Sequence, residues 1–188
     1  MASSVPDRLT PRAREIVTAG RELLEQEGPE ALSMRRVAQS LGIRAPSIYK
    51  HLPDKDALEA AIISTGFEDQ AARFEAAIEN CEDPLDALAR AYRDFAGQHP
   101  HLYRLMTERA LNRELLAPGS EERAARPLYQ ATGENLDLAR AAWAFAHGMT
   151  ILELNGRFAP DADLDAAWRH GIDALRPAVT SAGSTDGP

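Results

Sequence analysis

The chain has 188 residues, of which 44% are hydrophobic and 27% charged, and its formal net charge at pH 7 is −8. A chain of this length and composition can bury a core without disulfides or metals. The sequence contains no apolar run of about 18 residues and no apolar stretch near the N-terminus, which excludes a transmembrane segment and a secretory signal. The single Cys81 cannot form an internal disulfide, so we expect a cytoplasmic protein.

Charge is distributed unevenly along the chain. Residues 1–55 carry nine Lys/Arg and seven Asp/Glu, whereas residues 56–188 have a net charge of −10. A small DNA-binding head on an acidic body would produce this division, and ordinary variation would also produce it. The overall acidity therefore does not exclude nucleic acid as a partner.

The first third of the chain contains start and stop signals for three helices. Each segment begins with a Thr or Ser N-cap or a first-turn proline, and glycine or proline ends it. Apolar residues recur at helical spacing between these signals. We expect helices over 10–28, 33–42 and 46–52.

The rest of the chain also follows helical periodicity. Sustained alternation of apolar and polar residues is absent, so we predict an all-α fold: a three-helix head on a larger helical bundle. Prolines mark the breaks between elements, and the residues after Pro177 are small and polar, which predicts a disordered tail. The expected helices are 54–80, 84–98, 101–116, 121–131, 134–157 and 163–176.

The segment 33–52, SMRRVAQSLGIRAPSIYKHL, has the spacing of a helix-turn-helix. Ala38 provides a small residue where two helices cross, and Gly42, four residues later, tolerates the positive φ of a tight turn. Ile48 is placed to hold the second helix against the first. An αα-hairpin without DNA binding has the same packing needs, so the spacing alone leaves both interpretations open.

The outward-facing residues of this segment favour DNA. They are mainly phosphate and base-edge donors, and no acidic residue occurs between Arg35 and Lys50. The helix beginning at Ser33 also presents free backbone N–H groups to phosphates. These donors are Arg35, Arg36, Arg44, Ser47, Tyr49, Lys50, His51 and Lys55.

The stretch ALSMRRVAQSLGIRAPSIYKHLPDKDAL resembles the DNA-binding domain of TetR-type transcriptional regulators over about residues 10–60. The resemblance implies a DNA-binding domain over 1–55, a ligand-binding and dimerisation domain over 56–177, and a disordered tail over 178–188. It also implies a repressor that leaves a palindromic operator when a small molecule binds. The implied backbone contacts are Arg35, Tyr49, His51 and Lys55, and the implied major-groove residues are Arg44, Ala45, Pro46, Ser47 and Lys50.

The segment 134–157 is apolar on more than one side. One side can face the chain's own core and the other a partner subunit, so we expect a homodimer through 134–157 and 163–176. A charge at Ala142 or Ala146 should yield monomers or insoluble protein. A monomer that buries the whole helix is the alternative. The pattern Trp143-x3-His147-Gly148 resembles a C-terminal subtype within the family.

Aromatic and Met side chains with a few polar neighbours suggest a pocket for an unidentified small, largely apolar effector. Plain core packing explains the same residues equally well. The candidate ligand-binding residues are Tyr92, Phe95, Tyr103, Met106, Trp143 and His147.

Other classes of protein find little support in the sequence. We find no phosphate loop, nucleophile elbow or Glu-x-x-His motif, so we expect no catalytic residues, no metal site and no cofactor. His99-Pro100-His101 has no evident Cys or carboxylate partners for a metal. A helical enzyme or a protein-binding adaptor without DNA binding is the alternative to a regulator.

Overall fold

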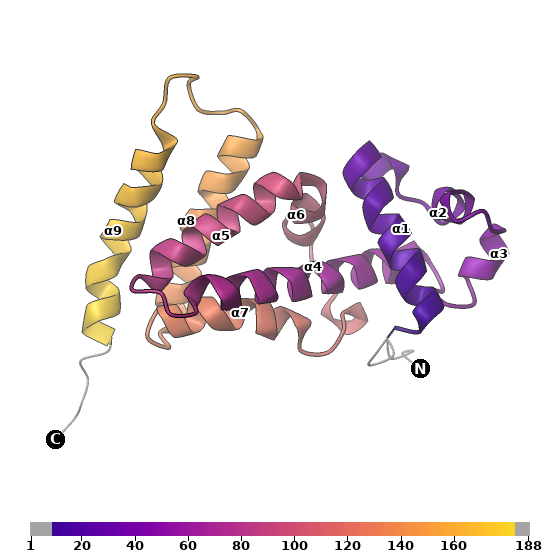
Figure 1. Ribbon diagram of the computed structural model, residues 1–188, viewed down its shortest axis with the longest axis horizontal. Helices are drawn as coiled ribbons and strands as arrows, with labels where there is room; N and C mark the ends of the chain where they lie inside the picture. The colour runs from indigo at the N-terminus through magenta and orange to yellow at the C-terminus, as the bar shows by residue number, and fades with distance from the viewer. Residues whose placement is uncertain (1–8, 183–188) are drawn as a thin grey trace. The chain divides into compact units, whose positions relative to one another are not determined.

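A computed structural model describes the backbone of residues 9–182 and the side chains of residues 9–176. In these residues the regular structure is entirely helical, which confirms the predicted all-α fold (Figure 1). Two short 3-10 turns, Pro29–Ala31 and Arg113–Leu115, connect α-helices. The α-helices are α1 (Pro11–Glu27), α2 (Met34–Ser40), α3 (Ala45–Ile48), α4 (Lys55–Ile78), α5 (Pro84–Gln98), α6 (Pro100–Thr107), α7 (Ser120–Ala131), α8 (Leu136–Leu154) and α9 (Leu164–Ala182).

Side chains next to the helix ends explain where several helices begin. The Thr10 hydroxyl accepts a hydrogen bond of 3.2 Å from the Ala13 N–H at the start of α1. The Asp54 carboxylate accepts one of 2.8 Å from Ala57 N–H at the start of α4. These caps satisfy backbone donors that lack a partner within the helix.

The chain folds as two compact units that do not follow a single cut in the sequence. The first unit contains residues 1–69 and 99–121, and the second contains residues 70–98 and 122–188. The helices 99–121 therefore pack with the N-terminal helices, not with the segments next to them in sequence. The prediction placed the boundary between the two domains at residue 55, whereas the first packed unit continues to residue 69 and also includes residues 99–121.

In the first unit, α6 packs against α1 and α4. A Glu25 carboxylate oxygen on α1 accepts a hydrogen bond of 2.8 Å from the Leu102 N–H in the first turn of α6. A Cβ atom placed on Gly66 of α4 would lie 2.7 Å from Met106 Sδ, so glycine allows α4 and α6 to approach closely. The Ser64 hydroxyl on α4 accepts a hydrogen bond of 2.9 Å from the Ala117 N–H.

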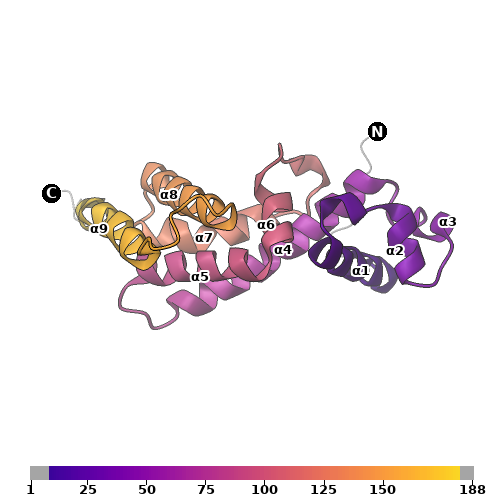
Figure 2. The same ribbon diagram turned by 90° about the horizontal axis from the view of Figure 1, so that it is seen from above.

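In the second unit, α8 and α9 lie side by side and run in opposite directions (Figures 1 and 2). The Phe145 ring on α8 meets the Trp168 ring on α9 edge to face, with ring centroids 5.5 Å apart. A side chain on Gly171 would overlap the Phe145 ring, so only glycine fits between the two helices at this point. Both helices also pack against α5.

Two predicted boundaries are wrong. The expected helix 101–116 ends at Thr107, and the chain then forms a 3-10 turn before Leu116, which is buried. The backbone of α9 continues past Pro177 to Ala182, although a disordered tail was expected from 178. The remainder of that predicted tail, 183–188, lies outside the described residues.

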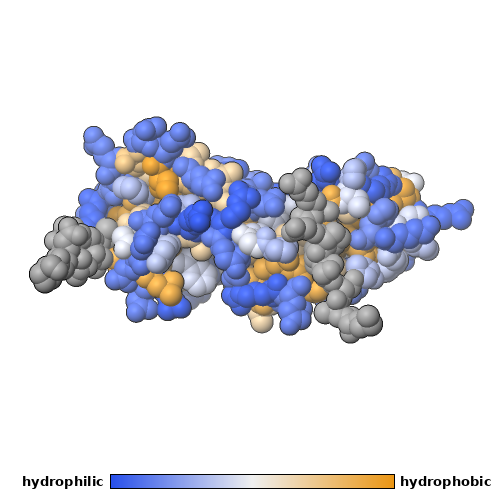
Figure 3. Space-filling model, turned by 90° about the horizontal axis from the view of Figure 1, so that it is seen from below, coloured by the Kyte–Doolittle hydropathy of each residue, from blue (hydrophilic) through white to orange (hydrophobic). Residues whose placement is uncertain are grey.

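Hydrophilic side chains occupy most of the face shown in Figure 3, and apolar side chains appear there in separate patches. Across the described part of the chain, none of the helices combines the length and the apolar character needed to span a membrane.

Candidate functional site

Helices α2 and α3 form a helix-turn-helix. The Ser33 hydroxyl caps α2 by accepting a hydrogen bond of 3.3 Å from the Arg36 N–H. Gly42 closes the turn with φ +65°, a conformation that favours glycine, and Ile43 N–H donates to the Ala38 carbonyl at 2.9 Å. Ala38 and Ile48 are buried, as the spacing predicts. The turn and the crossing therefore have the local geometry that the sequence indicates.

Helix α1 holds this motif through an ion pair that sequence analysis did not identify. The Arg36 guanidinium donates to both carboxylate oxygens of Glu27, at 2.7 and 2.5 Å. Arg36 was considered a phosphate donor, but here it links α2 to the end of α1. The neighbouring Arg35 is exposed.

The recognition segment is short and presents exposed donors. Helix α3 covers four residues, and hydrogen bonds from the N–H groups of His51 and Leu52 to the Ile48 carbonyl continue its turn. Tyr49 is 51% exposed. Within the described side chains, Arg35, Arg44 and Lys50 have no ion-pair or hydrogen-bond partner, so all three cationic groups are free to bind an anionic ligand.

The other predicted DNA-contacting residues are in different settings. Pro46, Ser47 and His51 are exposed, and Ser33 and Ala45 are half-buried. The Lys55 ammonium lies 3.3 Å from a Glu59 carboxylate oxygen, and Arg109 lies 3.8 Å from the other oxygen. Lys55 is therefore partly neutralised, unlike the three free donors.

The six predicted ligand-binding residues do not form one site in the structure. Tyr92 and Phe95 are buried in the second unit, whereas Tyr103 and Met106 are buried in the first. Trp143 is 50% exposed, and its ring centroid lies 6.0 Å from that of His147 on the same side of α8. The structure thus brings together only the last pair, on a helix surface.

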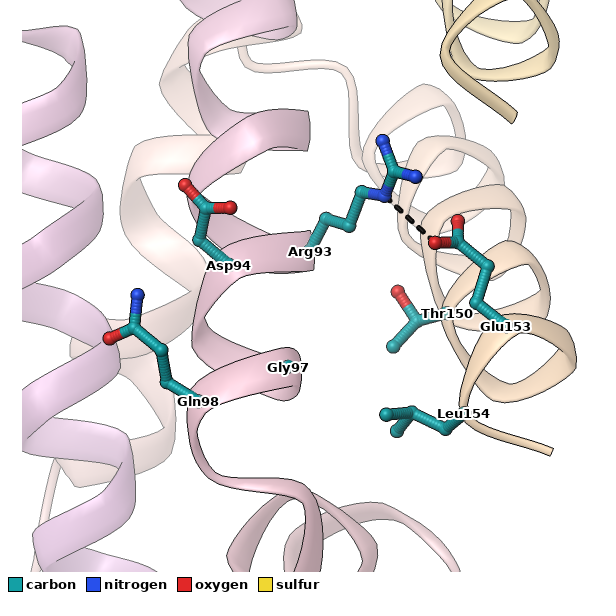
Figure 4. Close-up of a pocket in the computed structure, with 7 residues that line it drawn as sticks. All are labelled: Arg93, Asp94, Gly97, Gln98, Thr150, Glu153 and Leu154. Atoms are coloured by element: carbon teal, nitrogen blue, oxygen red, sulfur yellow. Dashed lines mark hydrogen bonds and ion pairs between the residues drawn. The ribbon is translucent and has the colours of Figure 1, made fainter. Parts of the chain in front are cut away.

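A cleft of about 290 Å³ lies between α5 and α8 in the second unit (Figure 4). Arg93, Asp94, Gly97 and Gln98 line it from α5, and Thr150, Glu153 and Leu154 line it from α8. Most of these residues have polar side chains, but apolar atoms make up more of the exposed lining, so the cleft presents both kinds of surface.

Arg93 connects three helices at one end of this cleft. Its guanidinium donates to Glu153 on α8 at 2.8 Å and to Asp165 on α9 at 2.6 Å, and it lies 5.8 Å from the centroid of the Trp168 ring. Burial opposes the charge of Arg93, but the two carboxylates outweigh this effect and raise its pKa. The hydrogen bond and the charge of Arg93 lower the pKa of Asp165. Arg93 is therefore a permanently charged, fully engaged cation.

Two family models match this chain. One, described as bacterial regulatory proteins of the tetR family, matches residues 16–62, which contain the helix-turn-helix. The other, a tetracycline repressor-like C-terminal domain, matches residues 85–175. The chain belongs to the TetR family. It is a DNA-binding transcriptional regulator.

Similar proteins agree with this assignment. An uncharacterised HTH-type regulator of Mycobacterium tuberculosis, Rv0681, is 28% identical over 81% of this chain and 74% of its own length. Several other curated relatives match over 42–61% of their length. A Rhodococcus protein of unknown function is 26% identical, with a TM-score of 0.71 over 90% of this chain and 96% of its own. TetR from Acinetobacter baumannii is 20% identical, with a TM-score of 0.62 over 92% and 98% of the two chains, and shares the fold.

Helix α8 of this TetR-family regulator has two apolar faces. Ala142 and Ala146 are buried within the chain, so a charge at either position would disrupt the subunit itself. Of the two expected outcomes, burial therefore favours insoluble protein over a folded monomer. Large apolar side chains border the exposed side of the helix: Leu136 at 53% and Trp143 at 50% exposure lie along one edge, and Leu152 at 41% lies along the opposite edge. Large apolar residues exposed together on one helix are typical of a surface that a partner covers.

Sequence reasoning missed the polar residues of the cleft. Thr150 and Glu153 interrupt an otherwise apolar helix, and this interruption was the available signal. The residues selected from that helix were Trp143 and His147. The partners of Glu153 on other helices are not visible in any local pattern.

Proposed function

We propose that this TetR-family regulator is a homodimeric repressor that binds a palindromic operator and is released by a small molecule. The observation that supports DNA contact at this site is the set of three exposed, unpaired cations on the helix-turn-helix. Arg35, Arg44 and Lys50 lie in a segment without acidic residues, on an otherwise acidic protein. Phosphates would neutralise them without first breaking an internal ion pair.

We assign different roles to the two groups of donors. Arg44 and Lys50 flank α3, which contains Ala45, Pro46 and Ser47. These five residues would face the base edges of the major groove. Arg35, Tyr49, His51 and Lys55 would contact the backbone, and Ser33 would present the N-terminus of α2 to a phosphate. The Lys55–Glu59 ion pair would loosen when a phosphate replaces the carboxylate.

The proposed dimer uses α8 and α9. The outer face of α8 supplies the apolar contacts, and exposed residues of α9, including His170 and Ala174, would border them. The apolar side of α9 faces its own chain through Trp168 and Ile172, both buried, so α8 would contribute most of the apolar area. Two heads in one dimer would match the two half-sites of a palindrome.

The remaining parts of the proposal concern the body. We assign it to the subtype with the Trp143-x3-His147-Gly148 pattern, whose paired rings on α8 support a role at the subunit surface. Binding of an effector to the body would favour a conformation with lower operator affinity. We propose no catalytic function, and we place the protein in the cytoplasm, where its operator is.

A gel shift with DNA from upstream of its own gene tests the repressor proposal, because an enzyme or adaptor would give no salt-sensitive, sequence-selective shift.

Within this assay, Arg44→Ala and Lys50→Ala should change the preferred bases, at a cost of about 1–3 kcal/mol per lost bidentate contact. Lys55→Ala should weaken binding to all sequences and lower the salt slope by about one. Selection of binding sites from random DNA measures the preferred bases, and gel shifts at several salt concentrations measure the salt slope.

Arg123→Ala is the matched control, since it removes an exposed charge from the second unit. It should leave site preference and salt slope unchanged. An unaltered preferred sequence in both Arg44→Ala and Lys50→Ala would show that α3 does not read the groove.

A further inference from the structure

The cleft between α5 and α8 contains a hydroxyl group that nothing in the described structure satisfies. Thr150 is 2% exposed, and its Oγ1 is buried without a hydrogen-bond partner among the described residues. Figure 4 shows this hydroxyl directed from α8 into the space facing α5. A buried polar atom is costly to leave unpaired, so its presence on a cleft wall points to a ligand atom that completes it.

The cleft also has an excess of negative charge, and one of its carboxylates is unpaired within the described side chains. Arg93 is already bound to Glu153 and Asp165, and the Glu153 carboxylate additionally accepts a hydrogen bond from the Trp168 indole N–H. Asp94 is exposed at the α5 edge of the cleft, and within the described side chains its carboxylate has no ion-pair or hydrogen-bond partner. An incoming anion would have to displace two carboxylates from Arg93, whereas a cation finds a free carboxylate.

Space for the ligand comes from Gly97. A Cβ atom placed on this residue would have no neighbouring atom within 4 Å, so the α5 wall is open beside Asp94. Leu154 supplies an apolar surface on the opposite wall (Figure 4). The cleft thus combines one free carboxylate, one unpaired hydroxyl and one apolar side chain.

We propose that this cleft binds a small organic cation: a protonated amine at Asp94, with a hydrogen-bonding group at Thr150 and an apolar part against Leu154. Its role as the effector site rests on the proposed function. A volume of about 290 Å³ suits a small molecule rather than a peptide or a long lipid chain. The proposed effector therefore carries a positive charge in addition to the apolar part that the sequence suggested.

Three probes of nearly equal shape test the charge preference: tyramine, its neutral alcohol analogue tyrosol, and the anion 4-hydroxyphenylacetate. Full-length protein without DNA is titrated by calorimetry and by amide NMR to about 10 mM, enough to detect millimolar dissociation constants. Tyramine should bind about fivefold or more tightly than tyrosol, as expected for one partly exposed charge pair, and the anion more weakly still. Absence of tyramine binding, or equal binding of cation and anion, overturns the proposal.

Four variants locate the site. Asp94→Asn should weaken tyramine binding by about fivefold, and Gly97→Leu should abolish it by filling the cleft without helical strain. Thr150→Val should raise the melting temperature while weakening binding, a combination that a merely structural hydroxyl would not give. Glu75→Gln removes an exposed charge of α4 outside the cleft and should change nothing. Unchanged affinity in both Asp94→Asn and Gly97→Leu would place the cation elsewhere and refute the inference.

The operator assay keeps this inference separate from the proposed function. Gly97→Leu should still shift operator DNA, and tyramine should weaken that shift only for the wild type. A protein that binds tyramine in the cleft but never shifts operator DNA would refute the proposed repressor and uphold the cation site.

Discussion

Replacing Ala144 with arginine should convert the dimer into a folded monomer. Ala144 is exposed on the outer face of α8, beside Trp143, so the larger side chain fits the isolated subunit. In the dimer the two new charges would be buried in an apolar interface without partners, which should raise the dissociation constant by about 100-fold or more. A monomer has one head, so the affinity for a palindromic operator should also fall by about 10²-fold or more.

Analytical ultracentrifugation measures the dimer, and circular dichroism confirms that the subunit keeps its helices. Ala142→Arg is the matched control on the inner face of the same helix, since Ala142 is 3% exposed. It should unfold or precipitate the protein instead of dissociating it. If Ala144→Arg remains dimeric at micromolar concentration, the subunits associate through another surface.

Truncating Phe95 to alanine should lower the free energy of unfolding by about 3–5 kcal/mol. Its side chain is fully buried in the second unit, and the Arg73 guanidinium lies 5.6 Å from its ring centroid. Core packing, the alternative to a pocket-lining role, predicts this large loss because the substitution leaves a cavity. Urea denaturation followed by circular dichroism measures the change.

Phe95→Leu keeps most of the buried volume and should cost about 1.5 kcal/mol or less. A loss below about 1 kcal/mol for Phe95→Ala would instead indicate that the ring borders an open cavity, as the pocket interpretation requires.

Local signals were sufficient to predict most of the helices. Thr10, Ser33 and Asp54 are N-caps in the structure, and Gly28 ends α1, because each of these roles depends only on nearby backbone groups. The end of α6 could not be predicted in this way. The segment after Thr107 leads to Ala117, whose N–H is held by Ser64 on α4, and the sequence does not display that contact.

The two candidate sites differ in the same way: one depends on residues that are close in sequence, and the other on residues that are far apart. The helix-turn-helix is contained in twenty consecutive residues, so its cap, crossing residue and turn are readable in order. The cleft depends on Arg93 meeting Glu153, sixty positions away, and on Asp165 from a third helix. Periodicity could show that Thr150 and Glu153 are polar on an apolar helix, but not which residues face them.

The hydrogen bond between Glu25 and the start of α6 has a consequence for protein engineering. Regulators of this kind invite chimeras in which the DNA-reading end of one protein is grafted onto the sensor of another. A graft that exchanges only residues 1–55 would separate Glu25 from its own Leu102, although Gly66 and Ser64 would keep their neighbours Met106 and Ala117. A transplant that carries residues 1–69 and residues 99–121 keeps the whole first unit together. The exchangeable module is therefore discontinuous in the gene, and two crossover segments are needed to move it.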